Sequence, residues 1–238
     1  MGNTDADSGK AMVQERVQYK KLWNRGGNEV VSINVAYNMD CMEAMRKMPD
    51  KCFDLAVVDP PYRDQSENQP TKDMRKNGTM EHFGDKPTKE YFEELFRVSK
   101  NQIIWGANNF DLPNYKGFLV WHKLSISDSF TMSMAEIAYL SEGLGTVSKI
   151  FDYAPQGTKD DPRIHPTQKP VALYAWIFQH YAKPGYKILD THLGSGSSRI
   201  AAYDAGLDFV GFEIDKDYFD RQEERYNAHA SQMNLFLD

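Results

Sequence analysis

Short apolar segments alternate with amphipathic segments along most of the chain. Short apolar runs flanked by turn-forming residues are typical of strands buried in a parallel sheet. In residues 53–59 (FDLAVVD), two prolines end the run at once, so we expect Asp59 at the carboxyl end of its strand. We predict strands at residues 30–38, 53–59, 101–109, 117–123, 135–143, 186–193 and 208–214.

Helical periodicity separates many of these strands. In residues 170–183, Val171, Tyr174 and Phe178 lie on one helical stripe, and Pro170 suits a first helical turn. We predict helices at residues 42–48, 89–100, 170–183, 196–206 and 216–229. Strands that alternate with helices predict an α/β fold, a Rossmann-like, doubly wound and mostly parallel sheet with helices on both faces.

One domain is predicted over residues 30–238, after an irregular N-terminal lead-in at residues 1–29. Residues 63–89 are polar and lack periodicity. Loops this long in a compact domain are usually functional or disordered. We therefore predict a mobile loop at residues 63–89 that closes over a ligand, with a disordered surface loop as the alternative.

Composition narrows the class of protein. The chain has 238 residues, of which 41% are hydrophobic and 13% aromatic, enough for a substantial core. No apolar run reaches the roughly 20 residues of a membrane helix, and the first residues lack an apolar secretory segment. Two cysteines, Cys41 and Cys52, cannot make a disulfide framework or a four-ligand zinc site. We expect a cytoplasmic protein.

The net charge of -6 at first argues against a nucleic-acid partner, because phosphate binders usually carry a basic surplus. Its location changes that interpretation. Residues 204–238 hold nine acids and three bases, whereas residues 1–203 hold equal numbers of each sign. The acidic surplus therefore belongs to the C-terminal segment, and charge does not exclude nucleic acid.

A glycine turn, Asp190-Thr191-His192-Leu193-Gly194-Ser195-Gly196, joins a predicted strand to a predicted helix. Gly194 and Gly196 permit a tight turn and close approach of a ligand. Glu213 ends the next strand, where an acid faces the same crevice and can accept both hydroxyls of a ribose. Together these features favour an adenosine-type ligand over a plain strand–helix turn.

The tetrapeptide Asp59-Pro60-Pro61-Tyr62 follows a buried strand directly. The prolines fix the backbone, so the Pro60 carbonyl lies beside the Asp59 carboxylate. Two adjacent acceptors suit a planar amino group, and Tyr62 supplies a flat face on which a base can stack. The alternative is a proline stop in which Asp59 caps a turn.

These motifs resemble those of amino-group DNA methyltransferases that depend on S-adenosylmethionine. DPPY precedes D-x-x-x-G-S-G in this chain, and that order resembles the β-type, circularly permuted arrangement of the family. The resemblance extends from about residue 30 to residue 225. His192, Leu193 and the Ser197-Ser198 pair depart from the family's usual residues at these positions.

The resemblance implies the residues of the site. Asp190, Glu213 and Lys169 are expected to hold the ammonium, ribose and carboxylate groups of S-adenosylmethionine, with no metal. The expected catalytic residues are Asp59, Pro60, Pro61 and Tyr62. The expected cofactor-binding residues are Asp40, Asp59, His165, Thr167, Gln168, Lys169, Asp190, Thr191, Gly194, Ser195, Gly196, Glu213 and Ile214.

The resemblance also implies the reaction. DPPY in this family goes more often with adenine at N6, so we expect site-specific methylation of adenine in double-stranded DNA, with the base flipped out. Cytosine at N4, RNA or single-stranded DNA are alternatives, as is a nucleic-acid-binding subunit without activity. Target recognition is expected at residues 110–165. We expect a bacterial or phage-encoded protein of a restriction-modification system. A homodimer is one arrangement that it can form.

Overall fold

The computed structural model describes residues 33–62, 85–129, 132–155, 163–165 and 167–234, and residues Asn34–Asp238 form one compact unit. The predicted lead-in at residues 1–29 and most of the predicted loop, residues 63–84, lie outside the described residues. The strands are β1 (Asn34–Asn38), β2 (Phe53–Val58), β3 (Ser99–Trp105), β4 (Phe118–His122), β5 (Ala135–Leu140), β6 (Lys149–Asp152), β7 (Lys187–Asp190) and β8 (Asp208–Glu213). The helices are α2 (Cys41–Met45), α4 (Lys89–Val98), α5 (Val171–Tyr181), α6 (Ser197–Asp204) and α7 (Lys216–Asn234), with short 3-10 helices η1 (Ala107–Asn109) and η2 (Glu142–Leu144).

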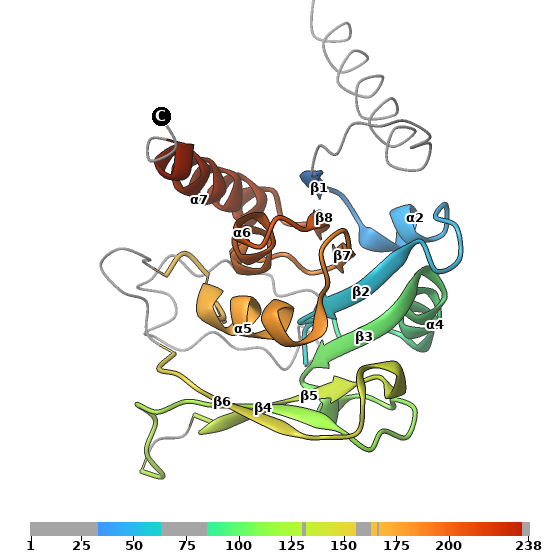
Figure 1. Cartoon of the computed structure of the whole chain (residues 1–238), viewed down its shortest axis with the longest axis vertical. Helices are drawn as coiled ribbons and strands as arrows, with labels where there is room; N and C mark the ends of the chain where they lie inside the picture. The colour runs from blue at the N-terminus through green and yellow to red at the C-terminus, as the bar shows by residue number, and fades with distance from the viewer. Residues whose placement is uncertain (1–32, 63–84, 130–131, 156–162, 166, 235–238) are drawn as a thin grey trace, which may run out of the picture. The chain divides into compact units, whose positions relative to one another are not determined.

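The described strands form one sheet in the order β1-β8-β7-β2-β3-β5-β4-β6 (Figure 1). Strand β5 pairs antiparallel with both β3 and β4, and all other pairings are parallel. The predicted mostly parallel, Rossmann-like α/β fold is therefore confirmed. Strand β6 was not predicted, because four alternating residues at the sheet edge carry too short a periodic signal.

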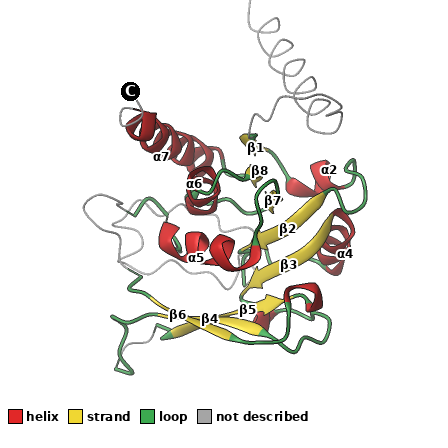
Figure 2. Ribbon diagram, viewed as in Figure 1, coloured by secondary structure: helices red, strands yellow, loops and turns green. Residues whose placement is uncertain are grey.

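The direction of winding reverses between β7 and β2, which are neighbours although their sequences lie far apart. From β2 the chain passes through α4 to β3, and from β7 it passes through α6 to β8 on the other side. Helices α2 and α4 pack together, as do α5 and α6, and Figure 2 shows the two pairs on opposite sides of the sheet. A reversal of this kind opens a crevice at the carboxyl ends of the two strands.

The core lies where α5 covers the central strands. Leu55 of β2, Ile103 of β3 and Leu173 and Ile177 of α5 are fully buried in one apolar cluster. Central strands buried on both faces need apolar side chains on both, which explains the continuous apolar run of β2. This packing fixes the carboxyl end of β2, and with it the start of DPPY.

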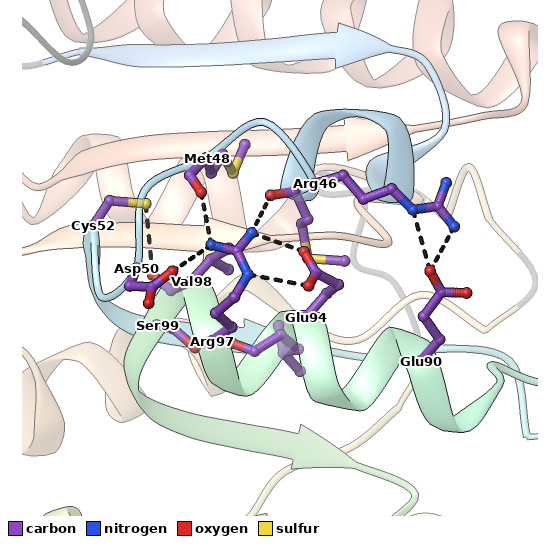
Figure 3. Close-up of polar contacts among 11 residues, drawn as sticks. Arg46, Met48, Asp50, Cys52, Glu90, Glu94, Arg97, Val98 and Ser99 are labelled. Carbon is purple, nitrogen blue, oxygen red and sulfur yellow. Dashed lines mark hydrogen bonds and ion pairs between the residues drawn. The ribbon is translucent and has the colours of Figure 1, made fainter.

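On the other face, Arg97 of α4 joins two helices (Figure 3). Its guanidinium donates to the carbonyl oxygens of Met45 and Met48 at 2.6 and 2.7 Å, and to the carboxylates of Asp50 and Glu94 at 2.7 and 2.8 Å. Carbonyl groups at a helix C-terminus need such donors. Arg97 therefore holds the end of α2 on α4 and stabilises the packing of these two helices on this face of the sheet.

Candidate active site

Four acids follow or end parallel strands at one edge of the sheet. Asp59 follows β2, Asp190 ends β7, Glu213 ends β8, and Asp40 follows β1 by two residues. The backbone N–H of Met39 donates to the Glu213 carbonyl at 3.1 Å, which keeps the end of β1 beside β8. The structure thus brings the DPPY and glycine motifs to neighbouring strand ends.

The glycine turn adopts a backbone that favours glycine. Gly194 and Gly196 have φ angles of 53° and 75°. A Cβ on Gly196 would lie 3.1 Å from Gln222 of α7, whereas one on Gly194 would meet only the His165 ring, at 3.8 Å. The backbone at Gly194 therefore leaves space that a ligand can approach closely.

Glu213 closes this turn from the next strand. Its Oε2 accepts from the backbone N–H of Gly194 at 2.8 Å, and its Oε1 accepts from that of Asp215 at 2.9 Å. Burial raises the pKa of Glu213, and these two hydrogen bonds oppose the rise. A carboxylate has about four lone-pair sites, so both oxygens retain capacity for a further donor.

Asp190 lies deeper than Glu213, with 2% of its surface exposed. Its Oδ1 accepts from the backbone N–H of His192 at 3.0 Å, and its Oδ2 accepts from the Ser198 hydroxyl at 2.5 Å. Burial raises the pKa of Asp190 to about 7. The carboxyl therefore fixes the start of α6 from the end of β7.

The segment His165-Pro166-Thr167-Gln168-Lys169 approaches the same turn, although Pro166 lies outside the described residues. The His165 ring packs on Tyr218 with centroids 4.2 Å apart and borders Gly194. Burial lowers the pKa of His165 to about 3, so it is neutral at pH 7. Thr167 donates its backbone N–H to His165 Nδ1 at 3.3 Å, and Gln168 Oε1 accepts from the backbone of Ile164 at 2.9 Å.

In the DPPY segment, the Tyr62 hydroxyl donates to Asp59 Oδ1 at 2.6 Å. The Tyr62 ring rests directly on Gly106, which follows β3 with a φ of 71°. A Cβ at Gly106 would lie 2.1 Å from Tyr62 Cε1, so only glycine fits beneath this ring. Phe110 meets the Tyr62 ring edge-on, with centroids 6.1 Å apart. The predicted strand at residues 101–109 thus ends at Trp105, because Gly106 turns the chain under Tyr62.

Glu136, which the sequence analysis did not single out, also belongs to this site. Its Oε2 accepts from the Tyr62 hydroxyl at 3.2 Å and lies 2.9 Å from Lys169 Nζ, while its Oε1 pairs with Lys123. Glu136 is the second residue of β5, whose antiparallel direction brings its amino end to the edge where the parallel strands have their carboxyl ends. The one available signal was a carboxylate in an otherwise apolar strand.

Lys169 lies with the carboxylates of Asp59 and Glu136. Its Nζ donates to Asp59 Oδ2, and only 3% of its side chain is exposed. Burial alone would lower the pKa of Lys169, but the two carboxylates outweigh it and raise that pKa. The ammonium group that was expected to hold a cofactor carboxylate is therefore engaged by the protein's own acids.

A family model described as DNA methylase (N6_N4_Mtase) matches residues 23–224. The chain belongs to this family. It is 28% identical over 213 residues to the protein YubD of Escherichia coli (strain K12), a match covering 79% of this chain and 88% of that protein. It is 22% identical over 248 residues to the type II methyltransferase M.HinfI of Haemophilus influenzae, covering 81% and 68%.

Solved methyltransferase structures share the fold of this DNA methylase. The M1.HpyAVI–SAM complex is similar at 19% identity and a TM-score of 0.52, covering 80% of this chain and 98% of that chain. The cytosine-N4-specific PvuII DNA methyltransferase is similar at 11% identity and a TM-score of 0.57, covering 88% and 96%. At such identities the likeness concerns the fold.

Three predicted cofactor residues of the methylase make other contacts. Asp40 caps α2, where its Oδ1 accepts from the backbone N–H of Met42 at 2.8 Å, and its side chain is exposed. Ser195 is buried, and its carbonyl accepts from Arg225 at 2.7 Å. Thr191 shares a 2.6 Å hydrogen bond with the Tyr91 hydroxyl. Their roles toward a cofactor stay predictions.

Ile214 differs from these three because it presents an apolar side chain next to Glu213, with 68% of its surface exposed.

Within the described ranges, no three His, Cys, Asp or Glu side chains gather in a way that can hold a metal ion. No helix in that same part of the methylase is long and apolar enough to cross a membrane.

Proposed function

We propose that this DNA methylase moves a methyl group from S-adenosylmethionine to the exocyclic N6 amine of adenine in double-stranded DNA. One observation carries the proposal: the Asp59 carboxylate and the glycine turn follow β2 and β7, which pair side by side at Leu55 and Ile188. Two reactants held at neighbouring strand ends lose little further entropy on the way to reaction.

The residues around the glycine turn fit the cofactor. Glu213 suits the ribose hydroxyls, exposed Ile214 suits an apolar ring face, and the open backbone at Gly194 suits the amino-acid part. His165, neutral and packed beside the turn, bounds the same space. The M1.HpyAVI structure of the same fold was solved as a SAM complex, which supports this cofactor for the present chain.

The DPPY segment fits the target amine. The amine would donate to Asp59 and to the Pro60 carbonyl, which draws its nitrogen toward tetrahedral geometry and localises the lone pair. When bound, S-adenosylmethionine would supply the methyl group and leave as S-adenosylhomocysteine, and the methylated nitrogen would then release one proton to water. Asp59 stabilises the positive charge that develops on nitrogen, in a site drier than bulk water.

Tyr62 supports a flipped base. Its ring is held on Gly106 and by its hydroxyl, which donates to Asp59 and lies 3.2 Å from Glu136, so its remaining face is fixed for stacking. Base stacking on an aromatic side chain contributes roughly 1–3 kcal/mol. That contribution would offset part of the few kcal/mol needed to unpair and unstack the target.

Adenine is proposed as the first candidate for the target base, because DPPY begins with Asp and this motif goes more often with adenine N6. Cytosine N4 is the second candidate, because the cytosine-N4-specific PvuII enzyme has a similar fold. Incubation with unmethylated duplex DNA and labelled S-adenosylmethionine, followed by nucleoside mass spectrometry, tests the choice. N6-methyl-2′-deoxyadenosine is expected, and a product that is N4-methyl-2′-deoxycytidine alone would contradict it. Equal-length single strands of DNA and RNA, run in parallel, test the proposed duplex substrate.

The DNA-facing surface is proposed on residues 110–165, with a homodimer as one way to complete it. Within this range, the cationic side chains of Lys116 and Lys149 lie outside the candidate active site, and the Lys116 side chain is 74% exposed. Lys123 does not belong with them, because its ammonium is buried against Glu136. Phosphate contacts from few cations predict a modest affinity that falls with salt. The same proposal includes a cytoplasmic location, a bacterial or phage origin and a role in restriction-modification.

A further inference from the structure

Four charged side chains meet at the start of the DPPY segment. Two are carboxylates, Asp59 and Glu136, and two are ammonium groups, Lys169 and Lys123. They come from different parts of the sequence: Asp59 follows β2, Glu136 is the second residue of β5, Lys169 precedes α5, and Lys123 follows β4. Burying four charges costs free energy unless each has a partner, so an arrangement of this kind points to a role.

Lys169 is the centre of this cluster. Its Nζ reaches both carboxylates, lies 3.2 Å from the Tyr62 hydroxyl, and stands over the Trp105 ring at 5.5 Å from its centroid. A cation over one aromatic face and between two carboxylates is held in one place. The ammonium therefore has little freedom to turn toward the glycine motif.

Several titratable groups face Asp59. From its own segment comes Tyr62, and from the segment before α5 comes Lys169. From β5, Glu136 raises the pKa of Asp59. The charge of Asp59 in turn raises the pKa values of Asp190 of β7, Tyr91 of α4 and Tyr174 of α5. Lys169 is the cation that contacts Asp59 among the described residues. Burial and Glu136 raise the pKa of Asp59, and Lys169 opposes both.

We propose that Lys169 is a positioning residue that keeps the Asp59 carboxylate ionised and oriented toward the target amine, and that Glu136 holds Lys169 in that place. This inference rests on the proposed function. Asp59 accepts one hydrogen bond on each oxygen, from Tyr62 and from Lys169. A carboxylate has about four acceptor sites, so it can still receive a donor from the amine.

The proposal differs from the role that the family resemblance implied, in which Lys169 binds the carboxylate of the cofactor. If Lys169 serves Asp59, its loss lowers the turnover number and changes the pH at which Asp59 ionises. If it serves the cofactor, its loss weakens cofactor binding and leaves the pH dependence of turnover unchanged. These two results are separable in one set of measurements.

The test compares Lys169→Met with Lys100→Met. Lys100 is a matched control because it also pairs with a carboxylate, Asp54 at 2.7 Å, but at the opposite end of the sheet. Single-turnover methyl transfer is measured from pH 5.5 to 9.5 on duplex DNA, with cofactor affinity by calorimetry. For Lys169→Met, the acid limb should move to higher pH by about one unit or more, which lowers the rate by about ten-fold or more at pH values below the limb and by less in alkali.

Glu136→Gln supplies the second variant. Removing its negative charge favours ionisation of Asp59, so the acid limb should stay or move to lower pH, while turnover falls because Lys169 loses its anchor. Cofactor affinity should change by less than about two-fold in either variant. An unmoved acid limb in Lys169→Met, or a selective loss of cofactor affinity, overturns the proposal.

The wild-type protein separates this test from that of the proposed function. Absence of methyl transfer to DNA by wild type contradicts the proposed function itself. Wild-type transfer with an unshifted limb in Lys169→Met contradicts only the positioning role. Circular dichroism and melting temperature, measured for each variant, exclude unfolding as the cause of a lost rate. If Lys169→Met does not fold, Lys169→Gln replaces it.

Discussion

The contact between Gly106 and Tyr62 shows how a single residue sets the site. The glycine lies after β3 and the tyrosine after β2, and the ring occupies the space that any side chain at position 106 would need. The Tyr62 hydroxyl then reaches Asp59 and Glu136 together. The spacing of DPPY predicts a stacking face but not the glycine beneath it.

Substitution Gly106→Ala should lower turnover by about ten-fold or more, because the new Cβ would displace the Tyr62 ring and with it the hydrogen bond to Asp59. Cofactor affinity should stay within about two-fold. Gly185→Ala is the control, since Gly185 also has positive φ, at 81°, but no atom within 4 Å of a new Cβ. Steady-state kinetics and calorimetry measure both, and equal rates in the two variants would refute the contact's role.

At the scale of elements, sequence periodicity located most helices and strands, because apolar runs and stripes are local properties. Strand β2 and helix α5 are examples, and both ends of β2 lie within one residue of the prediction. The antiparallel direction of β5 is a property of long-range pairing, and no local pattern carries it. Glu136 was missed for that reason, whereas Asp59 and Glu213 followed from the rule for parallel strand ends.

Helix α5 supplies the prediction at this scale. Leu173 is fully buried against the central strands, so Leu173→Ala should lower the free energy of unfolding by about 2–5 kcal/mol. Leu124→Ala is the matched control, because 60% of Leu124 is exposed and it should change stability by less than about 0.5 kcal/mol. Urea titration followed by circular dichroism measures both, and similar costs would contradict the assigned core.

At the scale of the molecule, the acidic surplus lies in the C-terminal residues 204–238, of which α7 forms the greater part. Within the unit Asn34–Asp238, α7 contacts α6, β1 and β8, the elements around the glycine turn. The acids therefore gather near the proposed cofactor side. Overall charge says little about DNA binding here, because the two signs are unevenly distributed along the chain.

Neutralising two exposed acids of α7, in the double variant Asp217→Asn with Glu224→Gln, should therefore change the Michaelis constant for DNA by less than about two-fold. Lys116→Ala, on the proposed DNA-facing segment, should raise that constant more, and the difference should shrink as salt increases. A large improvement in DNA binding from the α7 variant would place DNA against this helix and contradict the assignment.

The central claim is that Asp59 acts on the target amine from the edge of the sheet that also holds the cofactor. Single-turnover transfer and cofactor affinity of Asp59→Ala test it most directly. The account predicts that transfer to DNA is lost by about a thousand-fold or more, while the dissociation constant for S-adenosylmethionine changes by no more than a few-fold. A folded Asp59→Ala protein that still transfers the methyl group, or one that no longer binds the cofactor, would contradict it.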